Sequence, residues 1–143
     1  VFLITGAGGS FAEIIKLSGV NDAIVSLVTN LGGNIVLILI LSWGLGVIFR
    51  QITGSGTVAG ITSMTIMSSV APTIAIHPVF IALACLSGGM FGATVNDSGF
   101  WIVSNMSGFT LSGGVKTYTL GEAIASVVSL IVIVISGLLI MII

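Results

Sequence analysis

The chain has 143 residues, of which 56% are hydrophobic and only 5% are charged. Soluble domains carry about 25% charged residues, so three basic and four acidic side chains cannot cover the surface of a water-soluble globule. The composition therefore indicates an integral membrane protein and excludes a soluble enzyme, a nucleic-acid-binding protein and a secreted disulfide scaffold.

Residues 1–30 are predicted to form a broken or re-entrant segment. A glycine-rich run occupies residues 5–10, and a helix interior tolerates such a run poorly because each glycine costs about 1 kcal/mol relative to alanine. Ser10 and Glu13 have the spacing of a capping box, which predicts a short new helix over residues 11–17. No initial methionine and no signal-peptide cleavage site is visible, so we expect the chain to begin inside a hydrophobic segment of a longer protein.

A first membrane span is predicted over residues 31–49, which carry no charge and end at Arg50. Gly19 supplies a stop for the preceding short helix. Asn21 or Asp22 can then cap a further helix that ends at the glycine pair near the start of the span.

Two further spans are predicted over residues 57–76 and 79–95, in a region without any formal charge. Pro72 should bend or end the first of them, because proline removes a backbone donor and crowds the preceding turn. His77 beside Pro78 is typical of a turn residue near the membrane interface. A proton-relay role for His77 is the alternative.

The last predicted span covers residues 123–143, which are uncharged and rich in Val, Ile and Leu. Thr119 and Glu122 precede it with capping-box spacing, so Glu122 is interpreted as a helix-start residue at the interface. Together the segments predict one membrane domain over residues 1–143, with an all-α polytopic fold that contains broken or re-entrant helices.

A second glycine-rich break occupies residues 53–57, and each of the two breaks opens a helical segment, which points to a binding site. Non-helical backbone at membrane depth survives only where it is buried in protein or lines a watery cavity. In secondary transporters, broken helices direct free N-terminal amides at anionic substrate groups. The alternative is that the glycines only permit close helix packing. We therefore predict an anion site lined by the residues around both breaks: Gly8, Gly9, Ser10, Ser55, Gly56 and Thr57.

Two stripes of small or polar residues follow the helical repeat. Ala84, Gly88 and Gly92 recur every four residues and are assigned to helix packing. The second stripe could either bond back to its own helix or line a solute path, and the pattern does not separate these interpretations. It consists of Thr62, Thr65, Ser69 and Thr73.

Asp97 is an acidic residue between two long uncharged stretches, which makes it a functional candidate by default. Its carboxylate could take up a coupling proton, with Glu13 next in line. Asn96 and Ser98 beside it could hydrogen-bond a hydroxylated substrate. The alternative is a loop or helix cap outside the hydrocarbon, with Phe100 and Trp101 as interfacial aromatics.

An intramembrane enzyme is the main rival class, and the sequence argues against it. A membrane serine protease needs a placed serine and histidine, and the one histidine lies beside a proline. One histidine and one cysteine cannot supply a zinc ligand set. We therefore expect no enzyme, no metal and no cofactor. A channel or a non-transporting membrane subunit is a distant alternative, although no potassium-type filter sequence is present.

The chain resembles the gluconate permease family of bacterial proton-coupled organic-anion transporters. The V-N-D-S-G-F-W run is the most specific part, and the order and spacing of the motifs agree over essentially the whole chain. The motifs that carry the resemblance are residues 4–11, 18–24, 54–59, 95–101 and 116–122.

The resemblance implies a multi-pass permease of the bacterial inner membrane, of which this chain is the C-terminal part. It also implies an inverted repeat of two halves, so that the missing N-terminal half is a partner of this one, besides membrane lipid. The implied substrates are sugar acids such as gluconate, carried with protons; other members carry D-serine or hydroxy acids. Departures at Ser10 and Gly56 leave the selectivity open. A homo-oligomer is compatible with the resemblance, and nucleic acid is not an expected partner.

Overall fold

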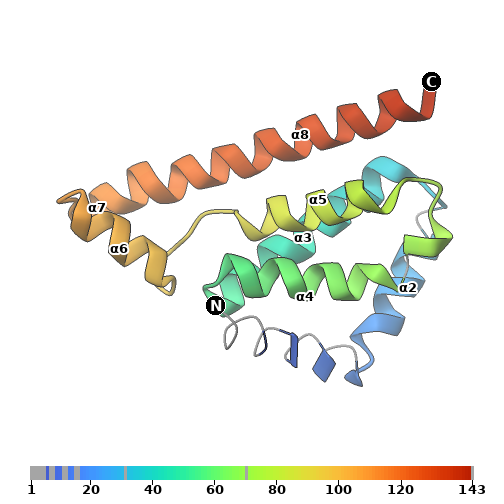
Figure 1. Cartoon of the computed structure of the whole chain (residues 1–143), viewed down its shortest axis with the longest axis horizontal. Coiled ribbons are helices and arrows are strands. Elements are labelled where there is room, and N and C mark those ends of the chain that lie inside the picture. Colours follow the sequence, from blue (N-terminus) through green and yellow to red (C-terminus); the bar gives the residue numbers. More distant parts are fainter. Residues whose placement is uncertain are drawn as a thin grey trace.

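The computed structural model describes the chain except for residues 1–5, 7–8, 11–12, 15–16, 31, 70 and 143. The fold is all-helical, and the described residues contain no strand. Figure 1 shows the helices in chain order. Their bounds are α2 Val20–Asn30, α3 Ile35–Thr53, α4 Gly56–Ser68, η1 Ala71–Thr73, α5 Pro78–Gly89, α6 Ser98–Met106, α7 Leu111–Gly114, η2 Val115–Thr119 and α8 Leu120–Ile142.

The central helix α3 is bounded by residues that satisfy its ends. Asn34 accepts a hydrogen bond from the amide of Leu37 and so acts as the N-cap. Gly32 and Gly33 have positive φ, which explains why the helix begins after them. At the other end Gly54 adopts the left-handed conformation with φ of 63°. The helix thus extends a full turn beyond residue 49, the end of the predicted span.

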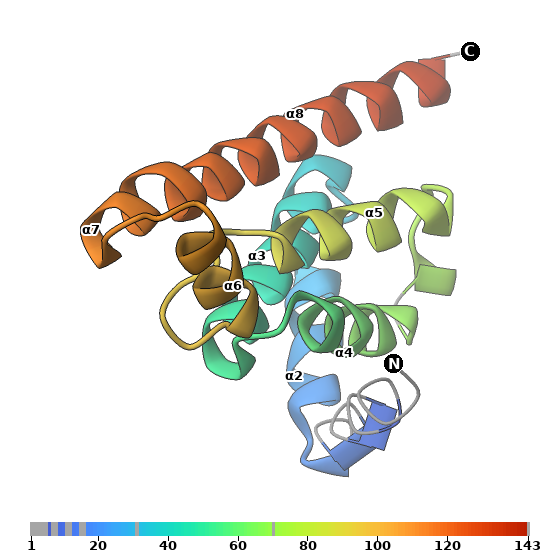
Figure 2. The same cartoon turned by 60° about the vertical axis from the view of Figure 1, so that its left-hand side comes forward.

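Helices α4 and α5 form an antiparallel hairpin that packs on α3 (Figures 1 and 2). They have 13 and 12 residues. At 1.5 Å per residue each is about 20 Å long or less, whereas a bilayer core is about 30 Å thick. Both are shorter than the predicted segments 57–76 and 79–95. Pro72 lies in the η1 turn between them, and Thr73 shares this turn, so the predicted polar face does not continue to Thr73.

Glycines allow the three helices to approach closely. A Cβ on Gly88 of α5 would collide with the backbone carbonyl of Trp43 on α3, and a Cβ on Gly46 would lie 2.8 Å from the amide nitrogen of Gly89. Ala84 is fully buried in the same contact. These contacts confirm the packing role predicted for Ala84 and Gly88. Gly92 lies beyond the helix end with φ of 50°.

The C-terminal helix differs from its prediction at its beginning. The stretch Leu111–Met141 is helical throughout and includes a π-helical turn at η2. The predicted N-cap Thr119 therefore lies inside a continuous helix, and the capping-box interpretation of Thr119 and Glu122 is wrong. Leu111–Met141 and Ile35–Thr53 are, by length and composition, the two helices in the described part of the chain that could cross a membrane.

His77, predicted as a turn residue, and Gly19, predicted as a helix stop, both lie at helix boundaries. His77 is the N-cap of α5, since its Nδ1 accepts a hydrogen bond from the amide of Val79 at 3.3 Å, and Pro78 occupies the first turn. This agrees with the interpretation of His77 as a turn residue. Gly19 has φ of 83° directly before α2.

Candidate functional site

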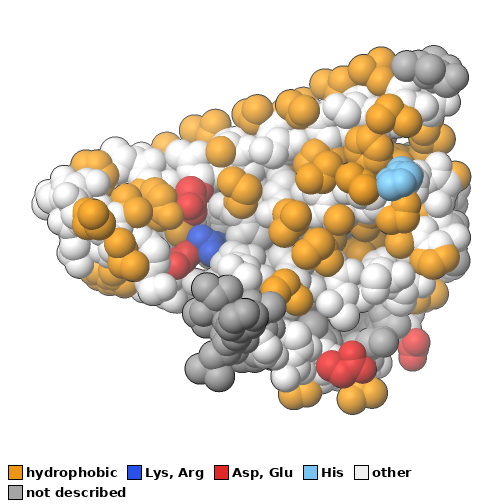
Figure 3. Space-filling model, viewed as in Figure 1, with side chains coloured by type: hydrophobic (Ala, Val, Ile, Leu, Met, Phe, Trp, Pro, Cys, Tyr) orange, Lys and Arg blue, Asp and Glu red, His pale blue; other side chains and the backbone are white. Residues whose placement is uncertain are grey.

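Three of the seven charged side chains in the sequence meet where α3, the loop before α6 and α8 come together. Arg50 Nη2 forms an ion pair with Asp97 Oδ2 and lies 3.5 Å from Glu122 Oε2. The side chains are 8%, 10% and 24% exposed in that order, so the first two are almost entirely buried. Figure 3 shows a basic group between two acidic groups on one face of the molecule, and further acidic groups lie apart from them at its lower right. We call Arg50, Asp97 and Glu122 the charged cluster.

Asp97 has a different role for each of its carboxylate oxygens. Oδ1 accepts a hydrogen bond of 2.7 Å from the amide of Gly99 and so caps the N-terminus of α6. Oδ2 pairs with Arg50, which lies in the last turn of α3, where the helix carbonyls favour a cation. The structure therefore combines the two interpretations that the sequence left open: Asp97 is a helix cap and also a buried ion-pair partner.

Glu122 connects the charged cluster to the loop before α6. Its Oε2 accepts a hydrogen bond of 2.8 Å from the amide of Ala93 in addition to the contact with Arg50. Thr119, one turn earlier, donates a hydrogen bond of 2.5 Å to the carbonyl of Ala93. Glu122 thus connects α8 to α3 and to this loop, and it is not a helix-start residue.

Both the nitrogen and the oxygen of the Asn96 side-chain amide form hydrogen bonds within the protein. Its Nδ2 donates to the carbonyl of Gln51 at 2.8 Å, and its Oδ1 accepts from Thr94 Oγ1 at 2.6 Å. Gln51 Nε2 in turn donates to the carbonyls of Phe91 and Gly92 at 3.2 and 3.3 Å. These bonds fasten the loop to the end of α3. Asn96 therefore holds the loop in place, and its predicted contact with a substrate would require these bonds to change.

The second glycine-rich break lies against the charged cluster. Ser55 caps α4 by accepting a hydrogen bond from the amide of Val58. A Cβ on Gly56 would lie 2.9 Å from Arg50 Nη1 and 2.9 Å from the carbonyl of Gly89. Packing alone therefore requires glycine at residue 56. Thr57 is exposed at the start of α4. The structure brings this break together with the Arg50–Asp97 ion pair, and Ser98 is exposed beside Asp97 in the first turn of α6.

A cavity of about 430 Å³ opens at this end of the hairpin. Uncharged residues of α4 and α5 and the residue after α5 line it, and its wall at Gly56 separates it from Arg50 Nη1. The lining residues are Gly56, Thr57, Ile61, Leu86, Gly89 and Met90. The N-terminal end of α4 faces this space, and free helix amides favour an anion there.

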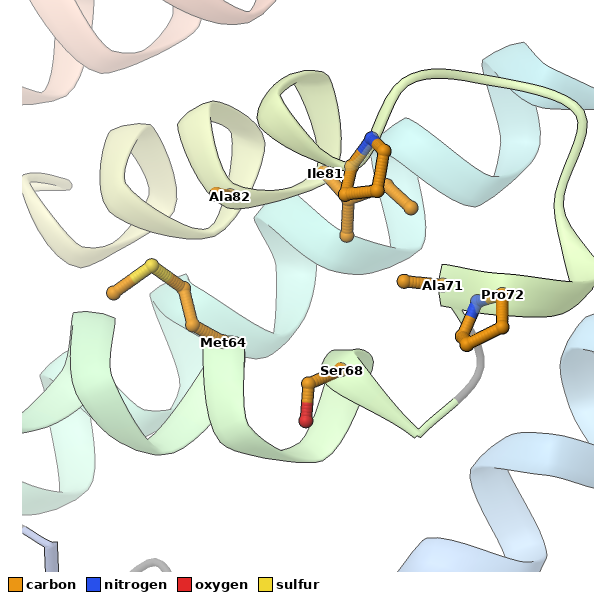
Figure 4. Close-up of a pocket in the computed structure, with 7 residues that line it drawn as sticks. Met64, Ser68, Ala71, Pro72, Ile81 and Ala82 are labelled. Atoms are coloured by element: carbon orange, nitrogen blue, oxygen red, sulfur yellow. The ribbon is translucent and has the colours of Figure 1, made fainter.

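A larger cavity of about 590 Å³ lies at the opposite end of the hairpin and is a poor candidate for an anion site. Figure 4 shows its lining, which is apolar apart from one serine hydroxyl. The residues are Met64, Ser68, Ala71, Pro72, Pro78, Ile81 and Ala82. Nothing in this lining would offset the cost of removing a carboxylate from water.

The first glycine-rich break lies largely outside the described residues, and so does Gly8. The structure describes Gly6, Gly9 and Ser10, all of which are helical and exposed, so the predicted break is not seen at these three. Glu13 is helical and exposed as well. No hydrogen bond or ion pair between described residues joins Gly9, Ser10 or Glu13 to the charged cluster.

The hydroxyl stripe of α4 mostly bonds to its own helix. Thr65 donates to the carbonyl of Ile61 at 2.8 Å, and Ser69 donates to that of Ile66 at 2.7 Å. Thr62 differs, because its buried Oγ1 has no hydrogen-bond partner among the described residues. The described residues also contain no group of three or more His, Cys, Asp or Glu that could hold a metal ion.

Sequence reasoning missed Arg50 and Glu122 as site residues. Both residues lie at the ends of predicted membrane segments, where charged residues are common in membrane proteins. The usable signal was the rarity of charge itself: with three basic and four acidic residues in 143, each charge at a helix end is a candidate partner for another.

A comparison with protein families gives one match, to the model described as GntP family permease, over residues 1–139. The chain is 36% identical over 139 residues to the gluconate permease of Pseudomonas aeruginosa. This aligned region covers 96% of the chain and 30% of the relative. It is 37% identical to the D-serine transporter DsdX of Escherichia coli K12 and 32% identical to the high-affinity gluconate transporter of the same strain. These matches cover 91% and 92% of this chain and 29% of each relative. No solved structure matches significantly.

Proposed function

Because the chain belongs to the GntP family of permeases, we propose that the protein containing it is a secondary active transporter for gluconate or a related sugar acid, driven by proton symport. Membership covers residues 1–139 and agrees with the all-helical, apolar fold. It also agrees with a location in the bacterial inner membrane. The chain spans about 30% of the length of the curated relatives it matches, so the activity of the whole protein is part of the proposal.

The substrate class is supported by what the named relatives have in common. One set of relatives is named for gluconate and another for D-serine. Both compounds are small acids with a carboxylate and at least one hydroxyl group. The identity of 37% to a D-serine transporter makes D-serine, or another small hydroxylated acid, the second candidate substrate. An enzymatic role has no support, since these relatives are named as permeases or transporters.

The observation that carries the proposal is the charged cluster itself. Burying ionised groups among apolar helices is costly unless they are well paired, and intramembrane charges mark substrate and proton pathways. Asp97 supplies a carboxylate that can take a proton, and Arg50 supplies a cation beside a helix N-terminus. Protonation of Asp97 would remove a like-charge repulsion against an incoming anion, which couples the two.

The α4–α5 hairpin is proposed to enter the bilayer and return on the same side. Its helices are too short to cross the hydrocarbon core, and its open end lies next to the charged cluster. Transporter sites of this kind form between two structural repeats. We therefore propose that a second half of the same protein completes the site, with a homo-oligomer as a further level of assembly.

The test is uptake by the intact protein in liposomes. Labelled gluconate should accumulate when the outside is more acidic than the inside, and a protonophore should abolish the accumulation. Unlabelled D-serine, added in excess, reports whether the second candidate competes. Downhill gluconate flux that a pH gradient does not drive would contradict symport, and no flux of either acid would contradict the substrate class.

A further inference from the structure

We propose that Arg50 binds the substrate carboxylate, and that Asp97 is the internal counter-ion that the substrate replaces once Asp97 is protonated. The inference rests on the proposed transport of small acids, and it assigns a role to a residue that sequence patterns left at a helix end. It has three supports: the unused donors of Arg50, the position of its guanidinium, and the charge of the cluster.

Arg50 uses one edge of its guanidinium for both of its ion pairs. The contacts to Asp97 and to Glu122 are made by the same nitrogen, Nη2. Arg50 Nε is buried and has no hydrogen-bond partner among the described residues. A guanidinium offers five donors in a planar fork that matches a carboxylate with two parallel bonds. Buried donors without partners are rare in proteins, so the unpartnered Nε is a donor that a further acceptor would satisfy.

The guanidinium lies at the end of the hairpin that holds the cavity. Arg50 Nη1 is 2.9 Å from the position of a Cβ on Gly56, and Gly56 lines the 430 Å³ cavity at the start of α4. Glycine at this residue keeps a side chain out of the space between the cavity and Nη1. Only the Gly56 backbone therefore lies between Arg50 Nη1 and a cavity that the α4 N-terminal amides face.

The charge of the cluster explains why a proton is needed. With both carboxylates ionised, Arg50, Asp97 and Glu122 carry one net negative charge, which repels an anion. A proton that binds a carboxylate oxygen of Asp97 makes the cluster neutral. The substrate carboxylate then pairs with Arg50 in place of Asp97 and restores one net negative charge. One proton therefore enters with one monovalent acid.

The structure allows this exchange without loss of the surrounding fold. Asp97 Oδ1 caps α6, whereas Oδ2 pairs with Arg50, so a proton on Oδ2 leaves the cap in place. Glu122 remains bound to the amide of Ala93, where it keeps Arg50 positioned. The groups that face Asp97 are Arg50 from α3, Glu122 from α8 and the Tyr118 hydroxyl from η2.

The first arm of the test measures binding of gluconate and of its uncharged amide, gluconamide, to the intact purified protein. Arg50→Gln should weaken gluconate binding by at least about 30-fold, as expected for truncating one member of a buried charge pair. It should not change the weak binding of gluconamide, which has no carboxylate. Arg50→Lys should retain part of the affinity. Lys116→Gln is the matched control, because Lys116 is an exposed cation in η2.

The second arm measures whether Arg50 is released from Asp97, and its main comparison is made without substrate. Phenylglyoxal modifies free guanidinium groups, and mass spectrometry of the Arg50 peptide gives the extent of modification. At one fixed pH, Asp97→Asn should raise the modification of Arg50 several-fold, and added gluconate should lower it again. Asp22→Asn, which removes an exposed carboxylate of α2, should leave it unchanged.

The outcomes separate this inference from the proposed function. Gluconate binding by Arg50→Gln within twofold of the wild type, or Arg50 modification that Asp97→Asn does not change, would show a purely structural ion pair and overturn the inference. Should the wild type bind neither gluconate nor D-serine, the proposed substrate class fails. The phenylglyoxal result with Asp97→Asn then still decides whether Asp97 is the counter-ion that shields Arg50.

Discussion

Ser87 and Ser126 exchange two hydrogen bonds between α5 and α8. Ser87 Oγ donates to the carbonyl of Ser126 at 2.9 Å, and Ser126 Oγ donates to the carbonyl of Ser87 at 2.6 Å. The Trp43 indole on α3 also donates to Ser126 Oγ, at 2.9 Å. A single buried hydroxyl therefore joins three helices. Ser126 lies one turn after Glu122 on α8. Its hydrogen bonds therefore help to set the position of α8 along its axis, and with it the position of the Glu122 carboxylate relative to Arg50.

We expect Ser126→Ala to destabilise the protein by about 1–3 kcal/mol, because it removes two hydrogen bonds between helices, from the Trp43 indole and to the Ser87 carbonyl, each worth about 0.5–1.5 kcal/mol. The melting temperature of the intact protein in detergent measures this effect. Ser129→Ala, on the same helix and only half-buried, is the control and should change it little. Equal melting temperatures for the two variants would show that the hydroxyl does not join the helices.

Gly54→Ala should destabilise the joint between α3 and α4. Gly54 has φ of 63°, a conformation that costs other residues roughly 1–2 kcal/mol, and an added Cβ would collide with the Asn96 carbonyl. Gly121→Ala is the matched control, since Gly121 is helical and a Cβ there meets no atom within 4 Å. That substitution should be neutral or stabilising by up to about 1 kcal/mol. A Gly54→Ala variant as stable as wild type would contradict this assignment.

The two glycine-rich breaks should respond differently to valine. Gly56→Val should lower the amount of folded protein in the membrane, because its side chain would meet Arg50 and the Gly89 carbonyl. Gly9→Val should leave folding unchanged, since no atom lies within 4 Å of a Cβ at Gly9. Folded yield and gluconate affinity are measured for both variants. Normal folding with lost affinity in Gly9→Val would place the first break in the substrate site; unchanged affinity would exclude it.

The helices were largely predictable because their signals are local. Charge-free stretches located α3 and α8, and the T-G-S-G sequence at residues 53–56 predicted the helix that begins at Gly56. The end of a helix can also be predicted from the local sequence where a glycine with positive φ is required, as at Gly19. Helix length was less predictable: an apolar composition does not reveal that α4 ends at Ser68 instead of continuing to residue 76.

The charged cluster could not be predicted in the same way. Arg50 and Glu122 are 72 residues apart, and nothing in either local sequence indicates the other. Thr119 and Glu122 match the spacing of a capping box, yet the helix already begins at residue 111, so both side chains are free to bind the Ala93 backbone instead. Tertiary packing thus overrides a correct local pattern. Asp97 was found because an isolated acid among apolar residues is informative without any knowledge of its partner.

Residues 1–143 alone should not transport. The site is proposed to form between two halves of the transporter, and this chain spans about 30% of the length of its relatives. Reconstituted in liposomes, the 143-residue chain should show no saturable gluconate uptake under an inward proton gradient. Robust saturable uptake by this chain would show that a second half is not required.

The proposed coupling makes a definite prediction for Asp97→Asn. Asparagine can still accept the hydrogen bond that caps α6, and it mimics the protonated acid. Removing the charge of this carboxylate from the vicinity of a bound anion removes an electrostatic repulsion of about 4 kcal/mol, the value for two charges about 4 Å apart at an effective dielectric constant of about 20. Glu13→Gln is the comparison, because Glu13 is the second candidate and is exposed.

The most direct measurement compares exchange with accumulation for Asp97→Asn in liposomes that contain the intact protein. We expect this variant to exchange labelled for unlabelled gluconate across the membrane at a rate similar to wild type, and to fail to concentrate gluconate when a pH gradient is imposed. Glu13→Gln should do both. Accumulation by Asp97→Asn at the wild-type level would contradict the assignment of Asp97 as the proton-coupling group.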